Sequence, residues 1–171
     1  CSSASGTQPT SVSTPMIFAI GFLSMFLLGG INGAFSASVP VDFALHDTYF
    51  VVAHIHYVLF GGSAMGIFGG IYYWFPKMFG RMMNEFWGKV HFWLMTPSFF
   101  VLTLGMMVIG LRGMRRRIVD YDPALGFDFT HLLMTIGGFL IALSVLIFFI
   151  NFFHSIKHGE KAEGNVWNSR S

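Results

Sequence analysis

Four long segments of the chain are almost free of charged residues, and this pattern limits the folds that are open to it. They cover about residues 16–39, 48–75, 88–111 and 129–154. A helix of about 20 apolar residues crosses the hydrocarbon core of a bilayer. None of the segments alternates with the two-residue period of a membrane β-barrel strand. We therefore predict an all-α, polytopic membrane protein with four transmembrane helices.

The composition supports a lipid rather than an aqueous environment. The sequence is 54% hydrophobic and 11% charged, whereas a water-soluble domain has about 25% charged residues. The net charge of +2 is small, and no basic stripe with interleaved aromatic residues is present, which argues against nucleic acid as a partner. We expect a polar stretch over residues 1–14, a transmembrane region over 15–156 and a polar tail over 157–171.

Prolines and polar residues predict where the helices begin, bend and end. Thr14 is expected to cap the first helix, with Pro15 in its first turn. Pro76 is expected to close the second helix and Pro97 to bend the third; Asp47 could cap the second helix at its start, as the alternative to binding a metal. The single cysteine, Cys1, is consistent either with a lipid-modified N-terminus or with a chain cut from a longer polypeptide.

His54 and His56 stand two positions apart inside the second apolar segment. Residues i and i+2 of an α-helix point about 200° apart, so the two imidazoles face opposite sides and need separate partners. They could be neutral rings hydrogen-bonded to neighbouring helices. Ionisable groups inside a membrane are costly and usually functional, however. We favour axial ligation of two flat cofactors, one on each side, for which haem suits imidazole better than zinc does.

Other polar and small residues are given more ordinary interpretations. His91 and His131 lie near segment ends, where their polar atoms are expected to reach water or headgroups, and His154 and His158 are expected to be interfacial. Glycines gather on the first two segments and let helices, or a flat ligand, approach closely. The positive-inside rule gives no clear orientation, because a dense arginine cluster opposes the basic loop and tail: Arg112, Arg115, Arg116 and Arg117.

The stretch "HDTYFVVAHIHYVLFGG", residues 46–62, resembles the helix of haem–copper oxidase subunit I, the catalytic subunit of cytochrome c oxidase, that holds both haems. Flanking motifs agree with it: "TPMIFAIGF" before it, then "YYWFPKMFGRMMNE", "GKVHFW", "GMRRR" and "DYDP". The resemblance runs from about Thr14 to the end of the chain. It implies that the four helices are helices nine to twelve of a larger twelve-helix bundle.

The resemblance also implies roles for single residues. His54 would be the axial ligand of the high-spin haem, where oxygen binds, and His56 that of the low-spin haem. The family usually has Phe between these histidines, where this chain has Ile55. His46 and Asp47 would hold a magnesium ion near the outer surface, shared with a neighbouring subunit.

The same resemblance implies that Arg116 and Arg117 bind haem propionates, since guanidinium fits a carboxylate bidentately. The family usually has Pro where this chain has Arg115. This role would account for the arginine cluster. It places that cluster with His46 and Asp47 on the outer side of the membrane and the C-terminus inside.

The function implied is that of a terminal respiratory oxidase, which reduces O2 to water with four electrons and couples this to proton translocation. The cofactors would be two haems of the haem A type, copper and magnesium. No "HPEVY"-like or "HH" stretch occurs here, so the copper ligands, and the second ligand of the low-spin haem, would come from other segments. Partners would be the rest of subunit I, oxidase subunits II and III, and cytochrome c or a quinol as electron donor, in a bacterial or archaeal plasma membrane.

Two other functions compete with this interpretation. A non-catalytic membrane anchor or assembly subunit could keep the sequence without ligating haem. A cytochrome b-like carrier of two haems is the other, but its ligands generally stand far apart along each helix, unlike His54 and His56.

Overall fold

A computed structural model describes residues 12–162 and 166–167, so Cys1 lies outside the described residues. Four helices are long and apolar enough to cross a membrane: Thr14–Ser36, Tyr49–Phe79, Glu85–Leu111 and Asp128–His158. Apart from helices, regular structure in the described ranges amounts to two isolated bridges. The prediction of an all-α chain with four membrane-length helices is confirmed.

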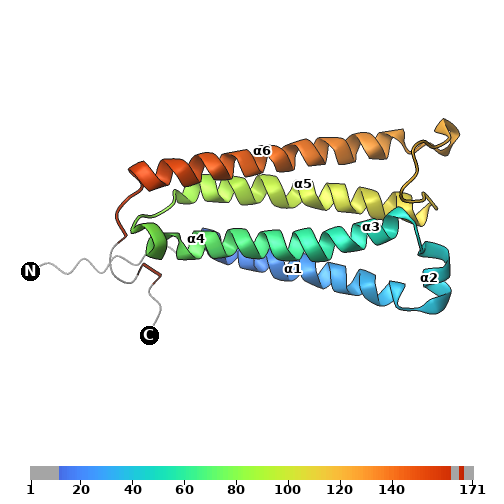
Figure 1. The fold of residues 1–171 in the computed structure, drawn as a ribbon, viewed down its shortest axis with the longest axis horizontal. Coiled ribbons are helices and arrows are strands. Elements are labelled where there is room, and N and C mark those ends of the chain that lie inside the picture. The colour runs from blue at the N-terminus through green and yellow to red at the C-terminus, as the bar shows by residue number, and fades with distance from the viewer. Residues whose placement is uncertain (1–11, 163–165, 168–171) are drawn as a thin grey trace, which may run out of the picture.

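The elements in chain order are α1 (Thr14–Ser36), α2 (Val39–Leu45), α3 (Tyr49–Ile55), η1 (His56–Ala64), α4 (Met65–Phe79), α5 (Glu85–Leu111), η2 (Pro123–Leu125) and α6 (Asp128–His158). The long helices run side by side in alternating directions (Figure 1). Helix α6 packs along α5, α5 against α3, and α1 against η1 and α4. The short helix α2 and the loop between α5 and α6 share one end of the bundle.

The second membrane helix consists of α3, η1 and α4 and is continuous over 31 residues. Its middle part, η1, is a π-helix, a form that appears mostly as short insertions within α-helices and often at functional sites. The helix does not stop at Pro76 as predicted but at Phe79, where Gly80 adopts a left-handed conformation (φ 64°). A proline this near the end of a helix removes only one backbone hydrogen bond, and glycine is the residue that ends helices readily in this conformation.

Two predicted caps are wrong, and in each case a neighbouring residue takes the position. Ser13 is the N-cap residue of α1, while Thr14 lies in the first turn and donates from N and Oγ1 to Glu85 Oε2, at 3.0 and 2.7 Å. Thr48 caps α3, because its Oγ1 accepts from the backbone N of Phe50 at 3.2 Å. Asp47 has φ of 60°, whereas a cap residue needs an extended backbone.

Other boundaries differ from the sequence-based ranges by a few residues. The first membrane helix ends at Ser36 rather than near residue 39, and the separate helix α2, which was not predicted, begins with Val39 and Pro40. Helix α5 begins at Glu85, capped by Asn84, and continues through Pro97. Helix α6 extends to His158, two residues past the predicted transmembrane region.

Aromatic and methionine side chains form the interior between the helices. The largest cluster of buried residues comprises Phe18, Met65, Tyr72, Phe75, Met83, Phe92, Met95 and Phe148. Much apolar surface stays outside it: on α6, for example, Phe139 is 74% exposed and Phe153 is 61% exposed. Such surface suits lipid or further helices rather than water.

Gly110 allows the closest approach between two helices. A Cβ at this position would overlap the backbone N of Phe50, and it would lie 2.7 Å from the Cα of Phe50 and from the carbonyl C of Tyr49. Backbone atoms cannot rotate away as a side chain can. The contact between the end of α5 and the start of α3 therefore requires glycine.

We predict that Gly110→Ala destabilises the bundle by about 1–3 kcal/mol or more, because overpacking against backbone forces the helices apart. Thermal unfolding of the full oxidase complex in detergent measures the effect. Gly138→Ala on α6 is the matched control, since its Cβ would meet only Leu102 Cδ1 at 3.9 Å. Equal stability of the two variants would contradict the prediction.

Candidate functional site

His54 is oriented by helix α1. Its Nδ1 lies 2.9 Å from the carbonyl oxygen of Gly29. A carbonyl only accepts, so Nδ1 carries the proton and Nε2 keeps its lone pair. Gly33, one turn further along α1, leaves room for the ring: a Cβ there would lie 2.8 Å from Cε1 of His54. Two glycines of α1 thus fix both the tautomer and the position of this imidazole.

His56 has the same tautomer, with the proton on Nδ1, but its hydrogen-bond partner lies in its own helix. It is the first residue of η1, and its Nδ1 lies 2.8 Å from the carbonyl oxygen of Val52 in the preceding turn. Nδ1 is again the donor, so Nε2 again carries the lone pair. His54 is bonded to a neighbouring helix and His56 to its own helix, and both rings are half-buried. Each imidazole therefore offers a free nitrogen for a ligand.

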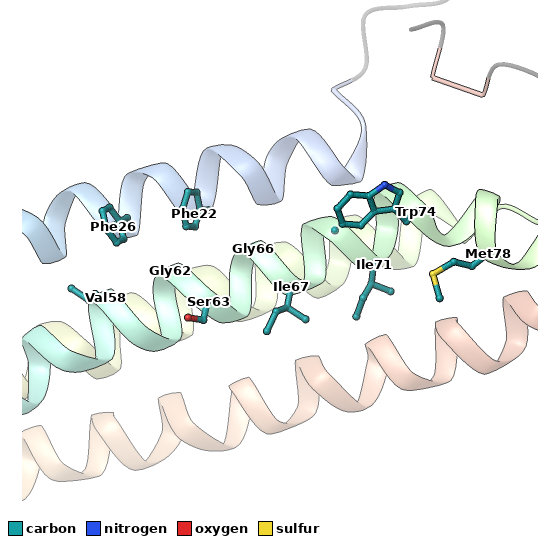
Figure 2. A pocket seen from close by; sticks show the side chains of 11 residues that line it. Phe22, Phe26, Val58, Gly62, Ser63, Gly66, Ile67, Ile71, Trp74 and Met78 are labelled. Carbon is teal, nitrogen blue, oxygen red and sulfur yellow. The ribbon is translucent and has the colours of Figure 1, made fainter. Parts of the chain in front are cut away.

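Two apolar grooves run along this helix next to the histidines. One, of about 690 Å³, lies between α1 and the η1–α4 helix (Figure 2). Its walls are Phe22 and Phe26 of α1 together with Val58, Gly62, Ser63, Gly66, Ile67, Gly70, Ile71, Trp74 and Met78. It begins at Val58, one turn after His54. A Cβ on Gly66 would meet only Phe22, at 3.8 Å, so the groove is open there.

The second groove has a volume of about 540 Å³ and is lined by His56 itself, with Ile55, Leu59, Phe60, Ser63, Ala64 and Ile67. Ser63 and Ile67 line both grooves and form a ridge between them. Leu59 and Ile67 are each 61% exposed. The helix thus presents two apolar grooves, one on either side of an exposed ridge.

The arginine loop and the segment before α3 meet at one end of the bundle. Arg116 Nε and Nη2 lie 2.7 and 2.6 Å from Oδ1 of Asp47. The backbones also pair, from Arg116 N to Asp47 O at 2.8 Å and from Tyr49 N to Met114 O at 3.0 Å. The expectation that these two segments share one side is met by direct contact.

Arg115 lies between these two backbone hydrogen bonds and forms an isolated antiparallel bridge with Thr48. The N–H of Arg115 itself is not a donor in this bridge. A proline is therefore compatible with this position, and arginine adds a side chain without changing the pairing. Arg117 has φ of 63°, a left-handed conformation that costs a non-glycine residue about 1–3 kcal/mol. Such strain persists only where the surroundings hold the backbone in place.

His46 and Asp47 lie together near this contact. His46 Nε2 is 3.5 Å from Asp47 Oδ2 and His46 Nδ1 is 3.9 Å from Asp42 Oδ2. The hydrogen bond from Arg116, above all, lowers the pKa of Asp47 from its ordinary value of 3.8. Across the described ranges, no cluster of three or more His, Cys, Asp or Glu side chains is arranged to hold a metal ion.

His91 was predicted to reach water or headgroups, and this is wrong. It is fully buried between Phe18, Phe68 and Phe148, and its Nδ1 lies 3.3 Å from the hydroxyl of Tyr72. The position near the start of α5 was misleading because neighbouring helices cover that end of α5. His154 and His158 are exposed, with ring centroids 5.0 Å apart.

Sequence reasoning did not identify the carbonyl of Gly29 as the partner of His54, although it noted the glycines of the first segment. It also did not connect His131 with the arginine loop. His131 Nε2 lies 3.3 Å from Met114 Sδ, next to the arginines. No local pattern in the sequence indicates either contact, because the first joins residues of two helices and the second joins a helix to a loop.

The family model described as "Cytochrome C and Quinol oxidase polypeptide I" matches residues 4–140. Cytochrome c oxidase subunit 1 of Synechocystis sp. is 49% identical over 158 residues, which are 92% of this chain and 28% of that protein. The subunit 1 proteins of Thermostichus vulcanus and Bacillus sp. (strain PS3) are 47% and 43% identical, each over 91% of this chain and over 28% and 25% of their own lengths. A heme-copper terminal oxidase dimer solved by cryo-electron microscopy has a similar fold, with a TM-score of 0.77 and 21% identity over 93% of this chain and 29% of that chain.

The chain thus spans about a quarter of the length of the curated relatives it matches. The matched region includes the histidine helix, both grooves and the arginine loop. Four apolar membrane-length helices and these relatives identify an integral membrane protein. The family match covers most of the chain, and the chain belongs to the cytochrome c and quinol oxidase polypeptide I family.

Proposed function

We propose that this chain provides the helix that ligates both haems in the catalytic subunit of a terminal respiratory oxidase. The oxidase would reduce O2 to water with four electrons and couple this to proton translocation. One observation carries the proposal. His54 and His56 both donate from Nδ1 to backbone carbonyls and so keep a free Nε2; His56 lines one apolar groove, and a second groove begins at Val58, one turn after His54.

The residues present fit haem. An axial imidazole needs its other nitrogen held by a hydrogen bond, which fixes the ring and raises the basicity of the ligating nitrogen. Gly29 O and Val52 O meet that need for His54 and His56. The apolar walls of both grooves suit a porphyrin, and the ridge at Ser63 and Ile67 would keep the two sides apart. When bound, the two haems supply one-electron transfer and the oxygen-binding site, with His56 assigned to the low-spin and His54 to the high-spin haem.

Arg116 and Arg117 are proposed to bind haem propionates. Asp47 occupies Nε and Nη2 of Arg116, which leaves Nη1 of that guanidinium and the whole of Arg117 for a further anion. Asp47 Oδ2 and His46 Nε2 face each other at 3.5 Å and are proposed to bind magnesium, with water and a neighbouring subunit completing the shell. The ion pair between Asp47 and Arg116 would then couple the metal site to the propionate site.

The remaining parts of the oxidase lie outside this chain in the proposal. Copper ligands and the second axial ligand of the low-spin haem would come from the rest of subunit I, with subunits II and III and cytochrome c or a quinol as further partners. The haems would be of the haem A type, in a bacterial or archaeal plasma membrane with the C-terminus inside. The competing function is a membrane anchor that binds no haem. In an anchor, the hydrogen bond of His54 to Gly29 O would serve only to hold the two helices together.

Separate alanine variants of the two histidines distinguish these functions in the purified complex. We predict that His56→Ala abolishes the low-spin haem bands of the visible spectrum. His54→Ala should abolish CO reactivity, because each variant removes one axial nitrogen. His158→Ala, which removes an exposed histidine of α6, is the control. Retention of both haem signals in both variants would support the anchor function instead.

A second prediction tests the support of His54 without removing it. Gly33→Ala should push the imidazole away from α1 and reduce CO reactivity, because its Cβ would lie 2.8 Å from the ring. Gly30→Ala on the same helix meets no atom within 4 Å and should leave the spectrum unchanged. CO recombination after flash photolysis gives the comparison. Identical kinetics in the two variants would show that α1 does not position the ligand.

The third prediction concerns the pH dependence of the arginine loop. The pKa of Asp47 is lowered in the folded protein, so the contact with Arg116 contributes above the unfolded pKa and is lost as pH falls through the lower, folded value. The protection factors of the backbone amides of residues 112–119 in hydrogen–deuterium exchange, which correct for the intrinsic pH dependence of exchange, should therefore not change between pH 7 and about pH 5. Asp47→Asn, which removes the charge but tolerates a left-handed backbone, should speed this exchange at pH 7. Exchange as slow as in the parent would rule out a role for the ion pair.

A further inference from the structure

The loop that carries the arginines is held at Met114, directly before them. Met114 is buried, its backbone O accepts from Tyr49 N, and its N donates to Ile109 O at 3.1 Å. This side of the loop is therefore tied to α3 and α5. Met114 O and Arg116 N are the two backbone groups that pair with the segment before α3.

Helix α6 holds the loop from the other side through His131. The Nε2 of His131 donates to Met114 Sδ at 3.3 Å, since a thioether sulfur only accepts. The His131 ring stacks on Tyr121, with centroids 5.2 Å apart and planes at 22°, and meets Tyr49 edge to face at 6.1 Å. One imidazole thus contacts the residue before the arginines and a residue four positions after them.

Tyr121 is in turn fixed to the start of α6. Its hydroxyl donates to Asp128 Oδ1 at 2.6 Å, and this bond is the main reason that its pKa is raised. The hydroxyl therefore stays protonated as a donor. Met114, Tyr121 and Asp128 together with His131 form a set of contacts, called here the α6 latch, that fixes both ends of the loop segment 114–121.

The α6 latch is needed to hold the strained backbone of Arg117. Its left-handed conformation (φ 63°) is kept only if both ends of the loop are fixed. Asp47 fixes the neighbouring Arg116, but no side-chain hydrogen bond of Arg117 occurs among the described residues. The direction of the Arg117 side chain therefore depends on the loop ends.

We propose that His131 is a positioning residue that holds Arg116 and Arg117 against the haem propionates by clamping Met114 and Tyr121. This rests on the proposed function, in which the two arginines bind those groups. His131 touches neither guanidinium. Its effect passes through the loop ends, so its loss moves positive charge away from the haem and leaves the axial ligands in place.

The test measures haem midpoint potentials by spectroelectrochemical titration of the purified full complex. The variants are His131→Ala, His131→Gln, which keeps an N–H donor, and Arg116→Ala as the reference for a lost guanidinium. His158→Ala, at the opposite end of the same helix, is the matched control. A cation near a haem favours the reduced form, so losing its contact should raise the oxidised-to-reduced ratio at a fixed potential by roughly tenfold.

We expect His131→Ala and Arg116→Ala to lower the potential, His131→Gln to restore most of it, and His158→Ala to match the parent. A parental potential in His131→Ala, with a lowered one in Arg116→Ala, would overturn the latch and leave the proposed function intact. A parental potential in both would overturn the propionate assignment and the latch with it. If His131→Ala does not assemble, Tyr121→Phe replaces it, since it keeps the ring and loses only the bond to Asp128. An unchanged potential in that variant also overturns the proposal.

Discussion

The close packing of α1 against the histidine helix is the contact on which the rest of this site depends. Gly29 and Gly33 bring the α1 backbone to the imidazole of His54, so that one carbonyl of α1 accepts a hydrogen bond from its Nδ1–H. In a membrane interior no water is available to serve as that partner. The glycines therefore act through the backbone they expose, and the tautomer of His54 follows from helix packing.

The π-helical segment η1 begins at His56, immediately after the α-helical turn that carries His54. His56 bonds back to Val52 within its own helix, while His54 bonds across to α1. A carbonyl of the neighbouring helix α1 and a carbonyl of the same helix thus hold the two imidazoles in the same tautomer. The exposed ridge at Ser63 and Ile67 lies between the two grooves.

In the arginine loop, an ion pair joins two segments that are far apart in sequence. Asp47 and Arg116 are joined by side chains and by backbone, and both segments contain a left-handed residue, Asp47 in one and Arg117 in the other. A loop of this kind has no regular structure of its own. Its shape is imposed by α3 on one side and by α6 on the other.

The apolar segments determined by themselves that the chain forms four membrane-length helices, because only an internally hydrogen-bonded backbone is stable in lipid. The spacing of His54 and His56 likewise determined that the rings diverge. Boundaries were less predictable: Thr48 rather than Asp47 caps α3, since the backbone angle at Asp47 is set by pairing with the arginine loop. The partner of His54, the burial of His91 and the contact of His131 with Met114 were decided only by the tertiary structure. Each depends on which faces of separate helices meet, and that choice follows from packing over the whole bundle rather than from any local pattern.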